Sequence, residues 1–210
     1  MVFSTFRDAV ERLLSSFHFG ITFGTARPGQ ITQCELPGGL RRGRWQKSVT
    51  EAARRVTMMN DAGGYQHLLR GYLRTCRRAV DNAYVAFLDP NAKSLETALR
   101  NLEKYLVVGL QSDMEETLKR WANVTVRSCR DHPRADVIEE RLGDALRSEL
   151  GGSDFRARTS EKRMEDGTPI RYPSLDEMDD DLQDMIREMT AKDQVIYKRV
   201  QEMFQLQRMS

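Results

Sequence analysis

The sequence lacks several features that would each define a class of protein. Its three cysteines, Cys34, Cys76 and Cys129, lie far apart and form no C-x-x-C pair, so their spacing indicates neither a zinc site nor a redox motif. One disulfide is compatible with them and none is implied. No apolar run approaches the roughly 20 residues of a membrane-spanning helix, and the N-terminus lacks the pattern of a signal peptide. We therefore expect no transmembrane segment and no targeting signal in this chain.

An excess of one charge is also missing. The 33 basic residues nearly balance the 31 acidic ones, which leaves a net charge of +2. Such a balance gives no global attraction to nucleic acid, so we expect no nucleic-acid partner and only a local anion site. A chain of 210 residues with 40% hydrophobic content suits one α/β domain, so we expect a single domain over 1–210.

The first twenty residues predict a strand, a tight turn and a helix. Residues 2–6 are apolar, β-branched or aromatic, as in a buried strand. Asp8 is placed to cap a helix, and Glu11 occupies the capping-box position three residues later. One face of this helix collects four apolar residues: Val10, Leu13, Leu14 and Phe17.

Two residues of this element are candidates for binding an anion. In an open α/β sheet, anions bind beyond the carboxyl end of a strand, next to the following helix. Arg7 would stand there with a guanidinium that matches phosphate, and Ser15 would add a hydroxyl two turns into the helix. An ordinary helix cap with a surface arginine would give the same pattern.

Residues 7–17, RDAVERLLSSF, resemble the 3′-phosphate-binding motif of carbohydrate sulfotransferases that use 3′-phosphoadenosine 5′-phosphosulfate (PAPS), especially the heparan sulfate 2-O-sulfotransferase group. In that family a strand is followed by R-D-P-x-x-R-x-x-S, whose arginine and serine hold the 3′-phosphate of the cofactor. The resemblance assigns these roles to Arg7 and Ser15, and it matches Arg12 to the second arginine. Ala9 replaces the usual proline, which loosens the turn without removing a ligand.

A second stretch carries the same resemblance. Ser94 predicts the start of a helix, and residues 105–110, YLVVGL, predict a buried parallel strand that a further helix follows. Residues 98–118, ALRNLEKYLVVGLQSDMEETL, are similar to a family segment in which a helix with N-L leads to Y-x-x-V-G-[LV]-T-E-x-[ML]-E. The resemblance implies a partial P-loop-NTPase-like sulfotransferase fold, with a short parallel sheet and many helices.

A basic loop at residues 153–163 completes the set of candidate cofactor ligands. Its composition alone indicates a solvated cationic loop. The sulfotransferases carry an R-K-T-x-x-K-like loop at this distance from the V-G-L strand, and it closes over the nucleotide. By resemblance, the cofactor contacts would come from Arg156, Arg158, Thr159 and Lys162.

The intervening segments give weaker signals. Residues 21–45 predict a long loop, in which a cluster of arginines would attract a sulfated polysaccharide or would simply be solvated. Helices are predicted at 46–60 and at about 65–88, the first ending at the glycines Gly63 and Gly64, and one more is predicted to stop at Gly151. The second helix carries arginines that either reach an anionic sugar or form a wet face: Arg70, Arg74, Arg77 and Arg78.

The C-terminal part is acidic and then helical. The run of acids over 174–184 would either chelate a hard cation or form a solvated helix face, and the family needs no metal for transfer. Thr190 to Asp193 resembles a capping box, which predicts that a final amphipathic helix begins there. Residues 193–204, DQVIYKRVQEMF, are similar to the closing helix of the family, so the resemblance extends from residue 2 to about residue 207.

The sequence lacks the catalytic parts of the family. The lysine loop that binds the 5′-phosphosulfate and the catalytic base both precede the R-D-P element, and this chain begins at that element, so the catalytic residues are unknown. Histidine is a residue type that can serve as a general base, but His18, His67 and His132 do not occupy the family's position, and Glu11 is better interpreted as part of a cap.

Three hypotheses follow from the sequence. The first is the carboxyl-terminal part of a PAPS-dependent carbohydrate sulfotransferase that is inert by itself, with a glycosaminoglycan-like acceptor and a Golgi location implied by the family. The second is a non-catalytic binder of PAP, PAPS or an anionic polysaccharide. The third is a helical interaction protein without a ligand. The acceptor hydroxyl and the oligomeric state stay open.

Overall fold

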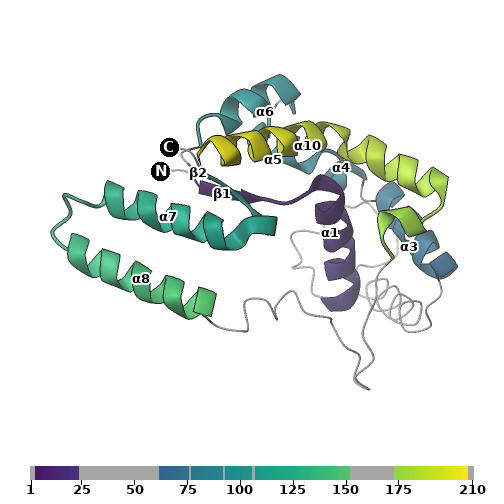
Figure 1. Cartoon of the computed structure of the whole chain (residues 1–210). Coiled ribbons are helices and arrows are strands. Elements are labelled where there is room, and N and C mark those ends of the chain that lie inside the picture. Colours follow the sequence, from purple (N-terminus) through teal and green to yellow (C-terminus); the bar gives the residue numbers. More distant parts are fainter. Residues whose placement is uncertain are drawn as a thin grey trace, which may run out of the picture. The chain divides into compact units, whose positions relative to one another are not determined.

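The computed structural model describes residues 3–23, 62–75, 77–91, 93–105, 107–151 and 173–207. Over these ranges the chain is mostly helical with one two-stranded parallel sheet, in agreement with a coarse α/β class (Figure 1). None of the helices in these ranges is both long and apolar enough to cross a membrane. The predicted helix at 46–60 and the basic loop at 153–163 lie outside them.

The chain divides into two compact units, each described separately below. The first unit comprises Met1–Arg7, Leu88–Glu161 and Val195–Ser210. The second comprises Asp8–Phe87 and Lys162–Gln194.

The first unit contains the sheet. Strands β1 (Phe3–Phe6) and β2 (Val107–Leu110) pair in parallel, with Phe6 opposite Leu110, and all four residues of β2 are buried. Both strands were predicted, and the burial of β2 agrees with a covered parallel strand. Side chains satisfy two of its backbone donors: the Val108 N–H donates to Gln207 Oε1 (3.4 Å) and the Leu110 N–H to Thr117 Oγ1 (3.0 Å).

Helices surround the sheet in the first unit. Two of them begin at side-chain caps, because Ser94 Oγ accepts the N–H of Thr97 (3.4 Å) and Asp113 Oδ1 accepts the N–H of Glu116 (3.4 Å). The cap at Ser94 and the stop at Gly151 confirm the sequence predictions. The helical elements between residues 94 and 151 are α6 (Leu95–Leu102), the 3₁₀ turn η1 (Gln111–Asp113), α7 (Met114–Ser128) and α8 (Ala135–Gly151). Figure 1 shows α8 beside α7.

Helix α1 (Ala9–Phe23) opens the second unit. Its cap is the predicted one: Asp8 Oδ1 accepts the N–H groups of Val10 (2.9 Å) and Glu11 (3.1 Å). The helix continues to Phe23, so residues 21–23, which were expected to belong to a loop, are helical and that part of the prediction is wrong.

The single helix predicted over 65–88 is three helices. These are α3 (Ala62–Thr75), α4 (Arg77–Val80) and α5 (Ala83–Leu88). Asn82 separates the last two in a left-handed conformation (φ 45°), where its Oδ1 accepts the Lys192 N–H (3.0 Å). Gly63 and Gly64 lie inside α3 instead of ending a helix, because burial of the tyrosine and leucine face of α3 outweighs their low helix propensity.

One apolar cluster holds the second unit together. It combines the inner face of α1 with those of α3 and of the first half of α10. Phe17 is central, since its ring stands edge-on to Tyr65 (5.5 Å between centroids) and tilted to Tyr72 (5.2 Å). The buried members are Leu13, Leu14, Phe17, Tyr65, Leu69, Leu73, Val80, Met178, Leu182, Ile186 and Met189.

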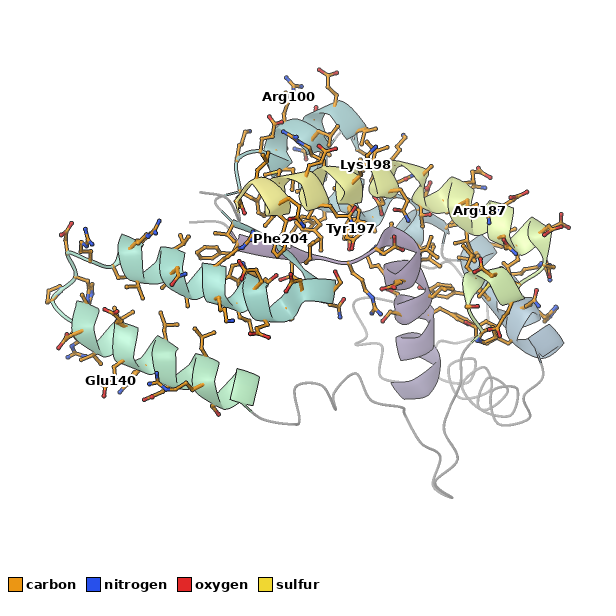
Figure 2. The ribbon with its side chains drawn as sticks, in the orientation of Figure 1. Arg100, Glu140, Arg187, Tyr197, Lys198 and Phe204 are labelled. Carbon is orange, nitrogen blue, oxygen red and sulfur yellow. The ribbon has the colours of Figure 1, made fainter. Side chains whose placement is uncertain are left out.

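The C-terminal region is one long helix. After a 3₁₀ turn η2 (Leu175–Glu177), α10 runs without a break from Asp180 to Leu206. The predicted start at Thr190 to Asp193 is therefore wrong: Thr190 is buried inside α10 and its hydroxyl donates to the carbonyl of Ile186 (2.8 Å). Figure 2 labels Tyr197 and Phe204, two buried residues of the last turns of α10.

Candidate functional site

Arg7 lies where the sequence placed it, directly after a parallel strand. Because Phe6 pairs with Leu110, both strands end at the same edge of the sheet. Arg7 is half-buried and follows β1, while Gln111 and Ser112 follow β2 and are exposed. The edge thus brings one guanidinium, one amide and one hydroxyl to the side of a parallel sheet where anions bind in α/β proteins.

The other predicted cofactor ligands are not brought to this edge by the described residues. Ser15 is half-buried on α1, which belongs to the second unit, whereas Arg7 closes the first segment of the first unit. The remaining predicted contacts lie outside the described residues: Arg156, Arg158, Thr159 and Lys162.

Arg12, the match to the second family arginine, forms an ion pair with Asp193 within the second unit. Its Nη2 donates to Asp193 Oδ2 (3.3 Å) and to the carbonyl of Val80 (3.4 Å), and the guanidinium lies 5.1 Å from the centroid of the Tyr84 ring. Only 19% of the Arg12 side chain is exposed, against none of Asp193. An arginine held this way positions helices and has little reach toward a ligand.

Asp193 is the residue that sequence reasoning missed. Its Oδ1 accepts the N–H groups of Tyr84 (2.9 Å) and Val85 (3.1 Å), so it caps α5 from a distant helix. Burial raises its pKa, although these hydrogen bonds and the Arg12 charge oppose the shift. The available signal was an aspartate within the apolar stripe that Met189, Asp193 and Ile196 follow at helical spacing.

Two of the three histidines have described side chains, and both lie on the surface. His67 and His132 are exposed, and His132 Nδ1 accepts the backbone N–H of Arg134 (3.2 Å). The side chain of His18 lies outside the description. Glu11 contributes to the cap through its backbone, as the sequence indicated.

The arginine-rich face and the acidic run, which the sequence analysis treated separately, face each other in the second unit. Arg70 pairs with Asp179, and Arg77 Nη2 lies 2.8 Å from Glu188 Oε1. Asp179 also accepts the Leu182 N–H (3.0 Å). Desolvation raises the pKa of Asp179, but the hydrogen bonds from Arg70 and Leu182 lower it by more, so the net shift of this pKa is downward. The residues in the described ranges contain no group of three or more potential metal ligands.

A groove separates the two faces between these ion pairs. It has a volume of about 650 Å³ and is hereafter the α3–α10 groove. Leu73, Met185 and Met189 form its apolar lining, and the core covers most of Leu73 and Met189. The charged lining comes from Arg74 and Arg77 on one side and from Asp181, Asp184 and Glu188 on the other.

No protein-family model, curated protein or solved structure gave a match to this chain.

Proposed function

We propose that this chain is a member of the PAPS-dependent carbohydrate sulfotransferase family and binds the 3′-phosphate of PAP or PAPS through Arg7. The resemblance of residues 7–17 to the family motif carries the proposal. The finer fold, a partial P-loop-NTPase-like sulfotransferase fold, belongs to the same proposal. So do the glycosaminoglycan-like acceptor, the Golgi location and the cofactor contact of Ser15.

The observation that supports the proposal is the placement of Arg7 at the carboxyl edge of a parallel strand pair. A parallel sheet directs its carboxyl ends to one edge, and helices that follow the strands begin there. Arg7 meets this condition for β1, with Gln111 and Ser112 after β2. A guanidinium offers a planar fork of donors that fits two phosphate oxygens at once.

The backbone amides at the start of α1 are less available to a phosphate. Asp8 Oδ1 already accepts the N–H groups of Val10 and Glu11, and Asp8 Oδ2 accepts Gln194 Nε2 (3.1 Å). The affinity for a phosphate group would therefore depend on side chains more than on the helix dipole.

A calorimetric titration of the whole chain with PAP tests the binding step. We expect binding by the wild-type chain and at least a tenfold loss on Arg7→Ala, in line with a charge-assisted hydrogen-bonded pair of about 1.5–3 kcal/mol. Arg100→Ala is the matched control, because Arg100 is an exposed arginine of the first unit (Figure 2) whose contact to Glu96 is long, at 4.0 Å. Equal affinities of the wild-type and Arg7→Ala chains would refute the site.

A second measurement separates the enzyme from a binder. Sulfuryl transfer needs charge neutralisation around the transferred group and a base for the attacking hydroxyl. Since none of the residues of this sequence matches the base or the 5′-phosphosulfate loop of the resembled enzymes, we expect PAP binding without transfer of radiolabelled sulfate from PAPS to desulfated heparan. Transfer by this chain would show that other residues supply the base.

A further inference from the structure

The α3–α10 groove carries unpaired charges of opposite sign on its two sides. Arg74 and Asp181 are exposed, and within the described residues neither side chain makes a hydrogen bond or an ion pair. Their neighbours are paired: Arg70 with Asp179, Arg77 with Glu188, and Asp184 with Arg187 on its own helix (3.3 Å).

The sequence spacing explains why the middle of this contact stays open. Arg70, Arg74 and Arg77 follow one another at four and three residues, so they lie on one face of the α3 and α4 region. The first and the last of them reach acids of the α10 region, and the middle one does not. Between the two ion pairs the apolar side chains of Leu73 and Met185 line the groove instead.

We infer that the α3–α10 groove binds a short apolar peptide with a free amino group and a free carboxylate. The ligand carboxylate would pair with Arg74, and its ammonium group would pair with Asp181. Its side chains would cover Met185, the partly exposed member of the apolar lining, and methionine suits such a surface because its flexible thioether adapts to different shapes. The volume of 650 Å³ falls in the range of small-ligand sites.

Ligands of a single charge fit this groove less well. An anion that approaches Arg74 also meets the carboxylates of Asp181, Asp184 and Glu188, and a cation that approaches Asp181 meets the two arginines. A zwitterion offers each side the opposite charge, and an uncharged peptide leaves both sides unpaired. The inference is independent of the PAP site, because the groove lining includes neither Arg7 nor Ser15.

Nuclear magnetic resonance of the whole chain with ¹³C-labelled methionine methyl groups tests the inference. The probe is trileucine, compared with its N-acetyl form, its amide and the doubly blocked peptide. We expect trileucine to shift the methyl signals of Met185 and Met189, assigned with Met185→Leu and Met189→Leu, and to bind in the millimolar range. Each blocked terminus should weaken binding about two- to fivefold, the worth of one exposed ion pair.

Charge variants test which end of the peptide binds to Arg74 and which binds to Asp181. Arg74→Gln should weaken trileucine about two- to fivefold and leave trileucine amide unchanged, whereas Asp181→Asn should weaken trileucine and leave N-acetyl-trileucine unchanged. Lys198→Gln and Glu140→Gln are the controls, because both residues are exposed, belong to the first unit and are labelled in Figure 2. Absence of methyl shifts at millimolar trileucine, or equal binding of the doubly blocked peptide, would overturn the inference.

Discussion

Arg120 of α7 holds the last turns of α10 through Phe204. Its Nη1 donates to the carbonyl of Phe204 (2.6 Å), and its guanidinium lies 3.8 Å from the centroid of the Phe204 ring. Nε donates to Glu116 Oε1 (2.7 Å), and Arg120 is only 8% exposed. A cation at the C-terminal end of a helix meets the negative end of its dipole, so one side chain joins two helices of the first unit.

We predict that Arg120→Met lowers the free energy of unfolding by about 2–4 kcal/mol, because it leaves the buried Phe204 carbonyl without this donor. Arg120→Lys should recover only part of the loss. The planar guanidinium donates to Glu116 and to the Phe204 carbonyl from two separate nitrogens, whereas lysine has a single ammonium nitrogen. Urea unfolding followed by circular dichroism measures both. The exposed Arg127 on the same helix gives the control, and Arg127→Met should stay within about 0.5 kcal/mol of the wild-type chain.

Gly109 in β2 leaves no room for a side chain. A Cβ at this position would lie 2.2 Å from Cγ2 of Thr117, whose hydroxyl accepts the Leu110 N–H and donates to the Leu110 carbonyl (3.1 Å). We predict that Gly109→Ala destabilises the chain by about 1–3 kcal/mol, the usual cost of overpacking a core. The melting temperature and the urea midpoint should both fall.

Thr117→Ser provides the matching rescue. It removes the methyl group nearest the new Cβ and keeps the hydroxyl that bonds to Leu110. In the double variant Gly109→Ala, Thr117→Ser we expect less destabilisation than the sum of the two single variants, with a coupling of about 1 kcal/mol. Additive effects would mean that Gly109 is required by the backbone rather than by Thr117.

Local signals predicted the two strands and the helix starts at Asp8 and Ser94. The caps at Asp8 and Ser94 depend on backbone N–H groups only two or three residues away. The buried strand β2 is visible in the sequence as an uninterrupted apolar run. Boundaries that depend on distant partners were not predictable in this way. The start of α5 is capped by Asp193, about 110 residues away, so periodicity alone joined α5 to α3 and placed a false start inside α10.

The candidate sites show the same division. Arg7 follows β1 as the local pattern required, because strand and helix cap are adjacent in sequence. The pairing of Arg70 with Asp179 and of Arg77 with Glu188 joins segments that lie more than 100 residues apart, and a single sequence contains no period that reports it. The composition indicated a solvated basic helix and a solvated acidic helix, whereas two ion pairs join them in the structure.

Asp8 offers a test of how the cap influences the proposed anion site. Asp8→Asn keeps an oxygen that accepts the N–H groups of Val10 and Glu11 but removes a negative charge next to Arg7. We predict little change in stability and a gain in PAP affinity of about threefold, close to the worth of one exposed charge interaction. Asp8→Ala loses the cap as well, so it should cost about 1 kcal/mol of stability. Weaker PAP binding by Asp8→Asn in calorimetry would place the phosphate away from this turn.

The contributions of Asp193 and Asp179 to the free energy of unfolding should change with pH in opposite directions. Burial raises the pKa of Asp193 above its ordinary value of 3.8, so between these two pKa values the folded chain binds more protons than the unfolded chain. Its contribution to the free energy of unfolding therefore falls as pH rises through that window. The pKa of Asp179 is lowered despite burial, because Arg70 and the Leu182 N–H favour the charged form, so its contribution is present above 3.8 and is lost as pH falls.

Urea unfolding of the wild-type chain, Asp193→Asn and Asp179→Asn at several pH values from about 3 to 8 separates these contributions, since an asparagine does not titrate in this range. The stability of the wild-type chain minus that of Asp193→Asn should decrease with rising pH just above 3.8 and then become constant. The same difference for Asp179→Asn should increase with pH and level off near 3.8. If the Asp193 difference rose with pH, the charge of Arg12 would outweigh burial, and the Arg12–Asp193 pair would stabilise the fold as ions rather than as a buried cap.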